Sequence, residues 1–263
     1  IIGSKGIDTI NGGLGDDTMT GGAGVDAFTV NAGTDVITDW GVDADTLSIG
    51  SGAIAVYNVV KAGGSVATFA SVANAGTLVV DASNSKASTV AGSTGFDSIT
   101  GSNYADTIST GNTTADWING GAGNDSLVGA AGADSLLGGL GNDTITGSTG
   151  NDVLDGNEGD DSITTSSVTN VTIRGGAGAD TITATTLSAA NIDGGAGNDL
   201  INVGTSLNVD DVVNGGEGVD TLAMSTALIA NFAGVTNIET LRLDAAAMNQ
   251  NMARFTGTTI DTI

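Results

Sequence analysis

The stretch from Gly120 to Thr164 decides the fold: it reads GGAGNDSLV, GAAGADSLL, GGLGNDTIT, GSTGNDVLD and GNEGDDSIT, five consecutive units of nine residues. Each unit begins with glycine, has a second glycine at its fourth place and an aspartate at its sixth, and carries Leu or Ile at its eighth. A fixed period of this kind indicates a repeat architecture, in which each unit stacks on its neighbours.

The nine places divide into a turn and a short strand. The first six, GGxGxD, concentrate glycine, which enters φ > 0 conformations without steric cost. The last three, Thr144 to Thr146 in one unit, suit a strand whose middle side chain points inward. Two such units make a rung of about 18 residues. The predicted fold class is therefore all-β: a parallel β-roll or β-helix solenoid, with one aliphatic side chain per strand inside and carboxylates along each edge.

The aspartates indicate the chemistry of the repeat. No basic residue lies between Asp116 and Asp161, so like charges would stack one rung apart, at roughly 4.8 Å. Such a ladder repels itself unless a cation lies between the rungs. Carboxylates and turn carbonyls make an all-oxygen cage, and Ca²⁺ favours six or more flexible oxygen ligands. The sequence therefore predicts calcium ions between the rungs.

This pattern resembles the RTX family, whose nonapeptide GGxGxDxUx forms a calcium-binding parallel β-roll. Seven stretches match it in full: Gly12 to Thr20, Gly21 to Thr29, Gly120 to Val128, Gly138 to Thr146, Gly175 to Thr183, Gly194 to Asn202 and Gly215 to Ala223. One copy alone would carry little weight, but seven full copies and many partial ones make the resemblance specific.

Composition narrows the possible functions. The 263 residues include 43 glycines and no proline, cysteine or histidine, and the formal charge is −24. No Ser-His-Asp triad, cysteine nucleophile or histidine-ligated zinc site can be built, and we expect no enzyme activity in this segment. The acidity argues against nucleic acid or an anionic membrane as a partner. Glycine-rich acidic chains can be disordered, which we expect of this one only without calcium.

The period divides the chain into five segments. We expect a first calcium-binding roll at residues 1–49, calcium-free β coils or a small β module at 50–91, and a second roll with calcium on both edges at 92–164. A wider β-helix with calcium on one edge should follow at 165–223, and calcium-free coils at 224–263. For 50–91, uncharged coils that continue the solenoid are preferred, because its apolar segments read as strands.

The predicted calcium ligands are the aspartates at the sixth place and their equivalents. Ions shared between stacked motifs would number about a dozen, and their charge would offset the formal −24. The residues are Asp8, Asp17, Asp26, Asp35, Asp45, Asp97, Asp106, Asp116, Asp125, Asp134, Asp143, Asp152, Asp161, Asp180, Asp199 and Asp220. In the second block one edge should take Asp97, Asp116, Asp134 and Asp152, and the other Asp106, Asp125, Asp143 and Asp161.

Calcium should also decide where the chain folds. Unliganded aspartates repel each other and ordering costs about 1–2 kcal/mol of backbone entropy per residue, so metal binding becomes folding energy. Extracellular calcium modules work at roughly 10⁻⁴ to 10⁻³ M. We therefore expect a chain that stays unfolded in low-calcium cytoplasm and folds outside the cell. No signal peptide or membrane-spanning run is visible, and we expect this chain to be a piece of a larger protein.

Three functions fit the repeat. The preferred one is a structural segment of a bacterial surface-layer protein, because GVTNIETLRL resembles segments that follow RTX repeats in such proteins. That resemblance implies type I secretion, partner copies of the same chain in a lattice, and lipopolysaccharide or another surface glycan as the anchor. The alternatives are the calcium-binding region of a large RTX adhesin or toxin, and the C-terminal roll of an exported hydrolase.

Overall fold

Short parallel strands make up every regular element in the part of the chain that the structure describes. The structure, a computed structural model, describes residues 1–39, 45–49, 54–58, 68–69, 77–81, 89–167, 170–205, 207–225 and 234–243. Among these, no helix is long and apolar enough to span a lipid bilayer. The chain forms an all-β parallel solenoid, as its period predicted. It divides into two compact units, Ile1–Ser135 and Leu136–Ile263.

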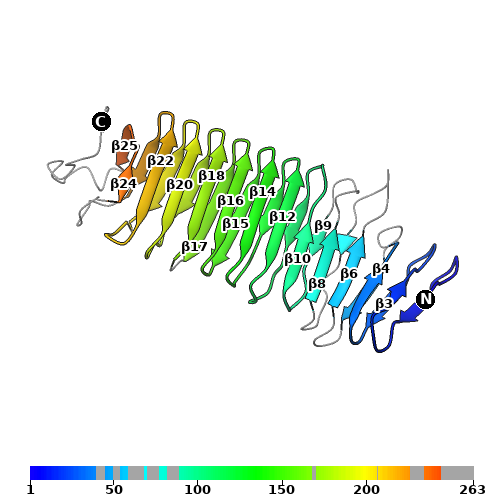
Figure 1. The fold of residues 1–263 in the computed structure, drawn as a ribbon. Coiled ribbons are helices and arrows are strands. Elements are labelled where there is room, and N and C mark those ends of the chain that lie inside the picture. The colour runs from blue at the N-terminus through cyan, green and yellow to red at the C-terminus, as the bar shows by residue number, and fades with distance from the viewer. Residues whose placement is uncertain are drawn as a thin grey trace. The chain divides into compact units, whose positions relative to one another are not determined.

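In the first unit, successive strands alternate between sheets as the chain winds (Figure 1). One sheet has the order β1 (Thr9–Asn11), β3 (Ala27–Val30), β5 (Thr46–Ile49). A second contains β2 (Thr18–Met19), β4 (Thr34–Ile37), β6 (Ile54–Asn58), β8 (Thr77–Asp81), β10 (Asp97–Thr100) and β12 (Trp117–Ala122) in that order. The opposite sheet contains β7 (Thr68–Phe69), β9 (Thr89–Ala91), β11 (Thr107–Ser109) and β13 (Ser126–Val128). Strand β14 (Ser135–Leu140) crosses the boundary between the units.

The described strands between residues 50 and 91 pair with the charged rungs on either side. Strand β6 pairs in parallel with β4, and β8 pairs in parallel with β6 and β10. In the register of the last pair, Val80 lies opposite Ile99. These strands therefore lie in the same stack as the aspartate-bearing rungs, although their own sequences contain no complete motif. Trp40 and most of the connecting residues lie outside the described part of the chain.

The second unit repeats the alternation with longer strands. One sheet has the order β16 (Val153–Glu158), β18 (Thr172–Ala177), β20 (Asn191–Ala196), β22 (Val212–Glu217) and β24 (Val235–Thr236). The other has the order β15 (Thr144–Thr149), β17 (Ser162–Ser167), β19 (Thr181–Ala184), β21 (Leu200–Gly204), β23 (Thr221–Met224) and β25 (Thr240–Leu243). Every pairing within these sheets that the structure describes is parallel.

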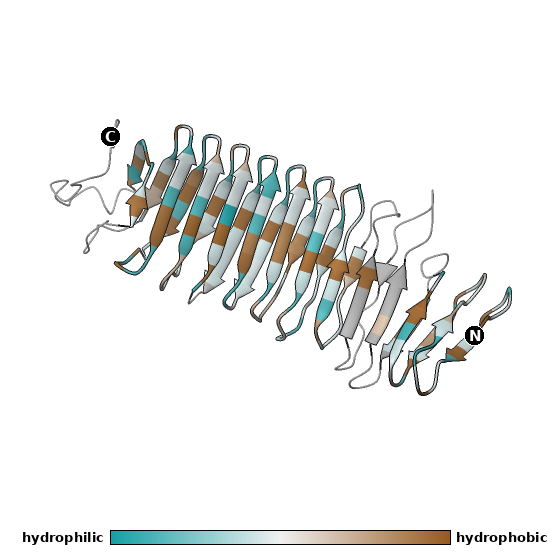
Figure 2. Ribbon diagram, viewed as in Figure 1, coloured by the Kyte–Doolittle hydropathy of each residue, from teal (hydrophilic) through white to brown (hydrophobic). Residues whose placement is uncertain are grey.

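Apolar side chains at the eighth place of the repeat form the core, as the sequence predicted, and a few strands bury a second one, such as Val203 beside Ile201 in β21. Ile163 lies between Ile145 and Ile182 in the register of one sheet, and all three are fully buried. Figure 2 shows hydrophobic bands that recur from strand to strand. Each such burial stabilises the fold by about 1.5–3 kcal/mol. The aliphatic column thus fixes the strand register, and the strand register sets the spacing of the corners that carry the aspartates.

Candidate metal centre

Most motif aspartates stack on the aspartate one rung away, because they lie at or near the start of strands that are in register with each other. The backbone N–H of Asp161 donates to Oδ1 of Asp180 at 2.8 Å. The same bond, at 2.7–3.0 Å, joins Asp8 to Asp26, Asp26 to Asp45, Asp17 to Asp35, Asp97 to Asp116, Asp116 to Asp134, Asp106 to Asp125, Asp143 to Asp161, Asp180 to Asp199 and Asp199 to Asp220.

The aspartates of the columns are mostly buried, and in some of them the second carboxylate oxygen accepts no hydrogen bond from the described residues. Thirteen of the sixteen predicted ligands are at most 3% exposed, and Asp8, Asp17 and Asp45 are half-buried. Among the described residues, buried Oδ2 atoms that accept no hydrogen bond include those of Asp17, Asp35, Asp116, Asp161, Asp180, Asp199 and Asp220. A buried charged oxygen without a partner is costly, so these atoms indicate a missing cation.

Burial raises the pKa of these carboxyl groups. The pKa of Asp180 rises to about 7, first because of burial and then because of the nearby charges of Asp161 and Asp199, against the lowering effect of the Asp161 amide. Burial likewise raises the pKa of Asp97, Asp125 and Asp161 to about 6. It also raises the pKa of Asp35, Asp116, Asp199 and Asp220. Raised pKa values mean that burial makes the ionised form of these carboxyl groups unfavourable, and nearby positive charge would offset that cost.

Backbone carbonyls complete the oxygen lining of each corner. A Cβ on Gly156 would overlap both Oδ2 of Asp161 and the carbonyl oxygen of Gly175 in the next rung. A Cβ on Gly176 or Gly178 would overlap the carbonyl oxygens of Asn157 or Gly159 in the preceding rung. Carbonyl oxygens at the second and fourth places and the carboxylate at the sixth therefore face the space between two corners.

This donor set fits Ca²⁺. Among the described residues, no three acidic side chains gather around one point, so most ligands must be backbone carbonyls. In the Asp161–Asp180 pair the holding groups would be these two carboxylates and the carbonyls of Asn157, Gly159 and Gly175. All are hard oxygen donors, which suit calcium better than zinc or copper. A bound ion would supply positive charge between rungs and join the two corners.

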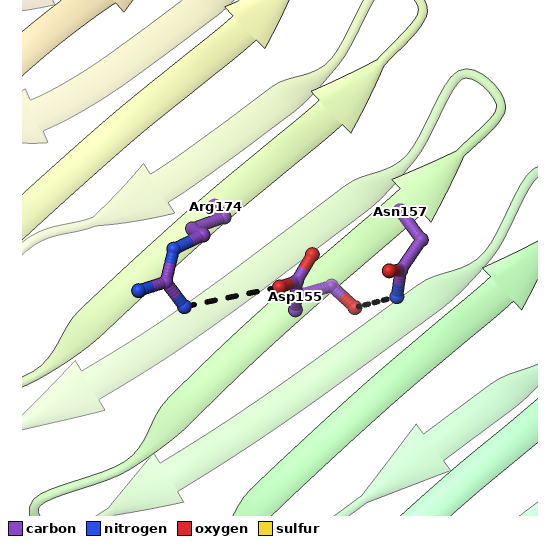
Figure 3. A network of polar contacts seen from close by, with 3 residues as sticks. All are labelled: Asp155, Asn157 and Arg174. Carbon is purple, nitrogen blue, oxygen red and sulfur yellow. Dashed lines mark hydrogen bonds and ion pairs between the residues drawn. The ribbon is translucent and has the colours of Figure 1, made fainter.

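Among the described residues, the observed ion pair does not supply positive charge to the aspartate columns. The ion pair that the structure shows joins Arg174 Nη1 to Asp155 Oδ2 at 3.8 Å, on strands β18 and β16 (Figure 3). The side-chain amide of Asn157 donates to the carbonyl of Asp155 in the same network. Asp155 is the ninth residue of its repeat and lies on the face of the sheet, so Arg174 leaves the aspartate column uncompensated.

On the first edge of the second unit, apolar residues follow the aspartates. Asp152 is fully buried and its carbonyl accepts the N–H of Thr172. Val171 and Ala190 stand at the same place in the next two rungs, and both are buried. On the second edge the aspartates stack from Asp161 through Asp180 and Asp199 to Asp220.

Two acidic residues that sequence reasoning did not assign join these columns. The carboxylate of Glu239 accepts the N–H of Asp220 at 2.8 Å and so continues the second edge by one rung. Asp211 returns to the first edge, where its Oδ1 accepts the N–H of Ala190 and its Oδ2 that of Asn208, both at 2.8 Å. The missing signal at Glu239 has a simple cause: its corner is too short to contain the six-residue motif.

The fifth place of the repeat forms a second ladder that the motif does not reveal. Oδ1 of Asp160 accepts the N–H of Ala179, and Oδ1 of Asn198 accepts the N–H of Val219, both at 2.8 Å. Oδ1 of Asn142 accepts the N–H of Asp160 at 3.1 Å. The frequent Asn-Asp pairs could have indicated this role, since either side chain offers the required oxygen.

Substituting one buried aspartate should separate its metal-binding role from its hydrogen bond. Asp161→Asn keeps an oxygen for the amide of Asp143 but removes the charge. We expect a loss of about 3 kcal/mol in calcium-bound stability, the scale for breaking a buried charge pair, measured by urea unfolding in calcium. Asp160→Asn is the matched control, since Asp160 is exposed and its change in charge is the same. Equal losses in both variants would contradict a metal role for Asp161.

Acid should partly replace calcium. Between the unfolded pKa near 4 and the folded values of about 6 to 7, the folded chain without metal binds more protons than the unfolded chain. Stability of the metal-free fold is therefore fully present below pH 4 and is lost as pH rises through 6 to 7. In a chelator, we expect the β-sheet circular dichroism signal to grow between pH 7.5 and 5. A signal that stays flat or falls would contradict the raised pKa values.

Comparisons with known proteins agree with this geometry. The profile of the RTX calcium-binding nonapeptide repeat matches residues 2–37, 91–112, 110–145, 137–168, 169–185, 191–205 and 210–223, together more than half of the chain. The matched ranges leave out residues 38–90, which include strands β5, β6, β7 and β8. A comparison with curated protein sequences gives no match.

Proposed function

Because the chain belongs to the family of RTX calcium-binding nonapeptide repeat proteins, we propose that it is the structural segment of a secreted surface-layer protein. Membership of this family supports calcium binding by the repeats of the β-solenoid. The proposal adds that folding and assembly take place outside the cell, after type I secretion, and that the partners are further copies of the same chain.

One observation carries the structural role: the metal-binding aspartates are buried between rungs. Thirteen of them are at most 3% exposed, so an ion held there has protein oxygens around it and no approach for a substrate. Catalytic metal sites keep an open position, whereas structural sites are closed. Calcium distributed along two edges would stiffen the whole stack of rungs, which is what a lattice subunit or a spacer requires.

The extracellular location follows from the same coupling. Calcium sites of moderate affinity stay empty at cytosolic calcium levels and fill outside the cell. A chain that folds only on calcium binding can remain unfolded for export and then fold at external calcium concentrations. Lipopolysaccharide or another surface glycan is the anchor that we propose for the assembled layer.

Electron microscopy of the purified chain in millimolar calcium tests the assembly. We expect ordered two-dimensional sheets with calcium and none after a chelator is added. Isolated rods in calcium would contradict self-assembly and favour the calcium-binding region of a large adhesin or toxin. Hydrolytic activity that copurifies with the intact secreted protein would instead favour the C-terminal roll of an exported enzyme.

A further inference from the structure

The corner that opens the first edge of the second roll is followed by an irregular one. Residues 92–97 begin Gly92-Ser93, as some other corners do, but the next corner on this edge, 110–116, is one residue longer than the six-residue motif. In regular corners the facing oxygens are the carbonyls of the second and fourth places and the carboxylate of the sixth. Here the equivalent oxygens are the carbonyls of Ser93 and Gly95 and the carboxylate of Asp97.

A side-chain amide from the next rung already binds all three of these oxygens. Nδ2 of Asn112 lies 3.0 Å from the carbonyl oxygen of Ser93, 3.2 Å from that of Gly95 and 3.2 Å from Oδ2 of Asp97. Thr114 adds a second donor, since its hydroxyl lies 2.8 Å from the same Gly95 carbonyl. Protein N–H and O–H groups thus converge where a cation would stand.

The orientation of the Asn112 amide follows from its other end. Its Oδ1 accepts the backbone N–H of Thr114 at 2.7 Å. Because a backbone N–H is always a donor, the oxygen of the amide must face Thr114 and the NH₂ group must face the three oxygens. The extra residue in this corner makes the loop long enough for that side chain to reach across.

The Asp97 carboxylate is also satisfied from its own corner. The backbone N–H of Ser93 lies 2.9 Å from Oδ2 of Asp97, and the Ser93 hydroxyl lies 2.6 Å from Oδ1. The N–H of Gly95 in turn donates to the Ser93 hydroxyl at 3.1 Å. By contrast, buried Oδ2 of Asp116 on the next rung accepts no hydrogen bond.

We propose that the Asn112 amide takes the place of calcium between the Asp97 and Asp116 corners, so that this rung is metal-free inside a calcium-binding roll. Asp97 is then a hydrogen-bond acceptor rather than a calcium ligand, and the metal column of this edge begins with Asp116. The inference rests on calcium binding by the repeats, and it does not depend on assembly into a surface layer.

The metal-free corner has a consequence for folding. It joins the uncharged strands of residues 50–91 to the calcium-binding rungs, and its hydrogen bonds form without an ion. The junction can therefore keep its shape at calcium concentrations that leave the other corners empty, and it offers a formed edge on which calcium-dependent rungs can stack. Nearest-neighbour stacking of this kind lets folding spread from one formed repeat.

Crystals of the full chain grown in calcium, with an anomalous difference map from the bound calcium, test the proposal. We expect a peak between Asp161 and Asp180 and none between Asp97 and Asp116. A peak beside Asp97, with the Asn112 amide turned away, would overturn the inference and leave calcium binding elsewhere intact. Absence of peaks at every corner would overturn both the inference and the proposed function.

A charge-changing variant gives an independent readout. Asn112→Asp replaces the donor by a fourth oxygen, so we expect native mass spectrometry to count one more calcium ion per molecule than in the unmodified chain. Asn103→Asp, an equal charge change at an exposed corner position, should leave the count unchanged. An unaltered count in folded Asn112→Asp would overturn the proposal, and if that variant does not fold, the anomalous map of the unmodified chain decides.

Discussion

Replacing Gly197 with alanine is expected to destabilise the rungs around it strongly, even in saturating calcium. Gly197 has φ +141°, which an L side chain rarely adopts, and a Cβ there would overlap the carbonyl oxygen of Gly178 in the preceding rung. The obstacle is backbone, so no rotation of a side chain relieves it. The gap between rungs must open, which would weaken the bond from the N–H of Gly197 to the carbonyl of Glu217 and displace a carbonyl ligand.

We expect Gly197→Ala to lose about 3 kcal/mol or more, the upper range for a substitution at a strained backbone position. Urea unfolding in calcium, followed by circular dichroism, measures this loss. Gly15→Ala is the matched control: Gly15 is at the same place in its repeat with φ +101°, but nothing lies within 4 Å of a Cβ there. Its cost should be only about 1–2 kcal/mol, the penalty for the left-handed conformation alone. Equal losses of stability in the two variants would contradict a role for the close approach of Gly197 to the Gly178 carbonyl.

The repeat predicted most of the architecture because its two periods carry separate information. The aliphatic residue at the eighth place predicts which side chains point into the core. The aspartate at the sixth place predicts which corners lie on the same edge. The stacking of Asp106 on Asp125 and of Asp161 on Asp180 therefore followed from counting residues, as did the burial of the side chain at the eighth place.

The role of each oxygen could not be predicted in the same way. Whether a carboxylate meets an ion or an N–H depends on the backbone conformation of its corner, which one aspartate in a pattern does not report. Ser148 and Ser93 stand at the same place of their repeats, yet only Ser148 has positive φ, whereas the amide of Ser93 turns toward Asp97. The Asn112 contacts depend on an inserted residue whose path the period leaves open.

Corners that lack the GGxGxD motif could not be recognised from the sequence for a related reason. Glu239 reaches the end of the aspartate column from a shortened turn, and its longer side chain makes up part of the missing loop. A search for GGxGxD passes over such a corner because stacking preserves the position of the carboxylate group and not the sequence around it. The strands at residues 54–58 and 77–81 likewise have the rung geometry without the motif.

Calcium removal should have the largest effect of all. Each ion that binds only the folded chain stabilises it by about 2.7 kcal/mol when calcium is present at 100 times its dissociation constant. A few such ions already equal the 5–15 kcal/mol that stabilises an ordinary domain. Ions shared between neighbouring corners should also make the transition steep, and magnesium should not substitute, because it requires a tighter octahedral shell.

The most direct measurement is a calcium titration of the purified chain at pH 7.5, followed by circular dichroism, starting in chelator. We predict an unfolded spectrum without calcium, a steep cooperative gain of β-sheet signal as calcium rises, and no gain with magnesium at the same concentration. A full β-sheet spectrum in chelator that calcium leaves unchanged would contradict the claim that metal ions between stacked aspartate corners hold this solenoid together.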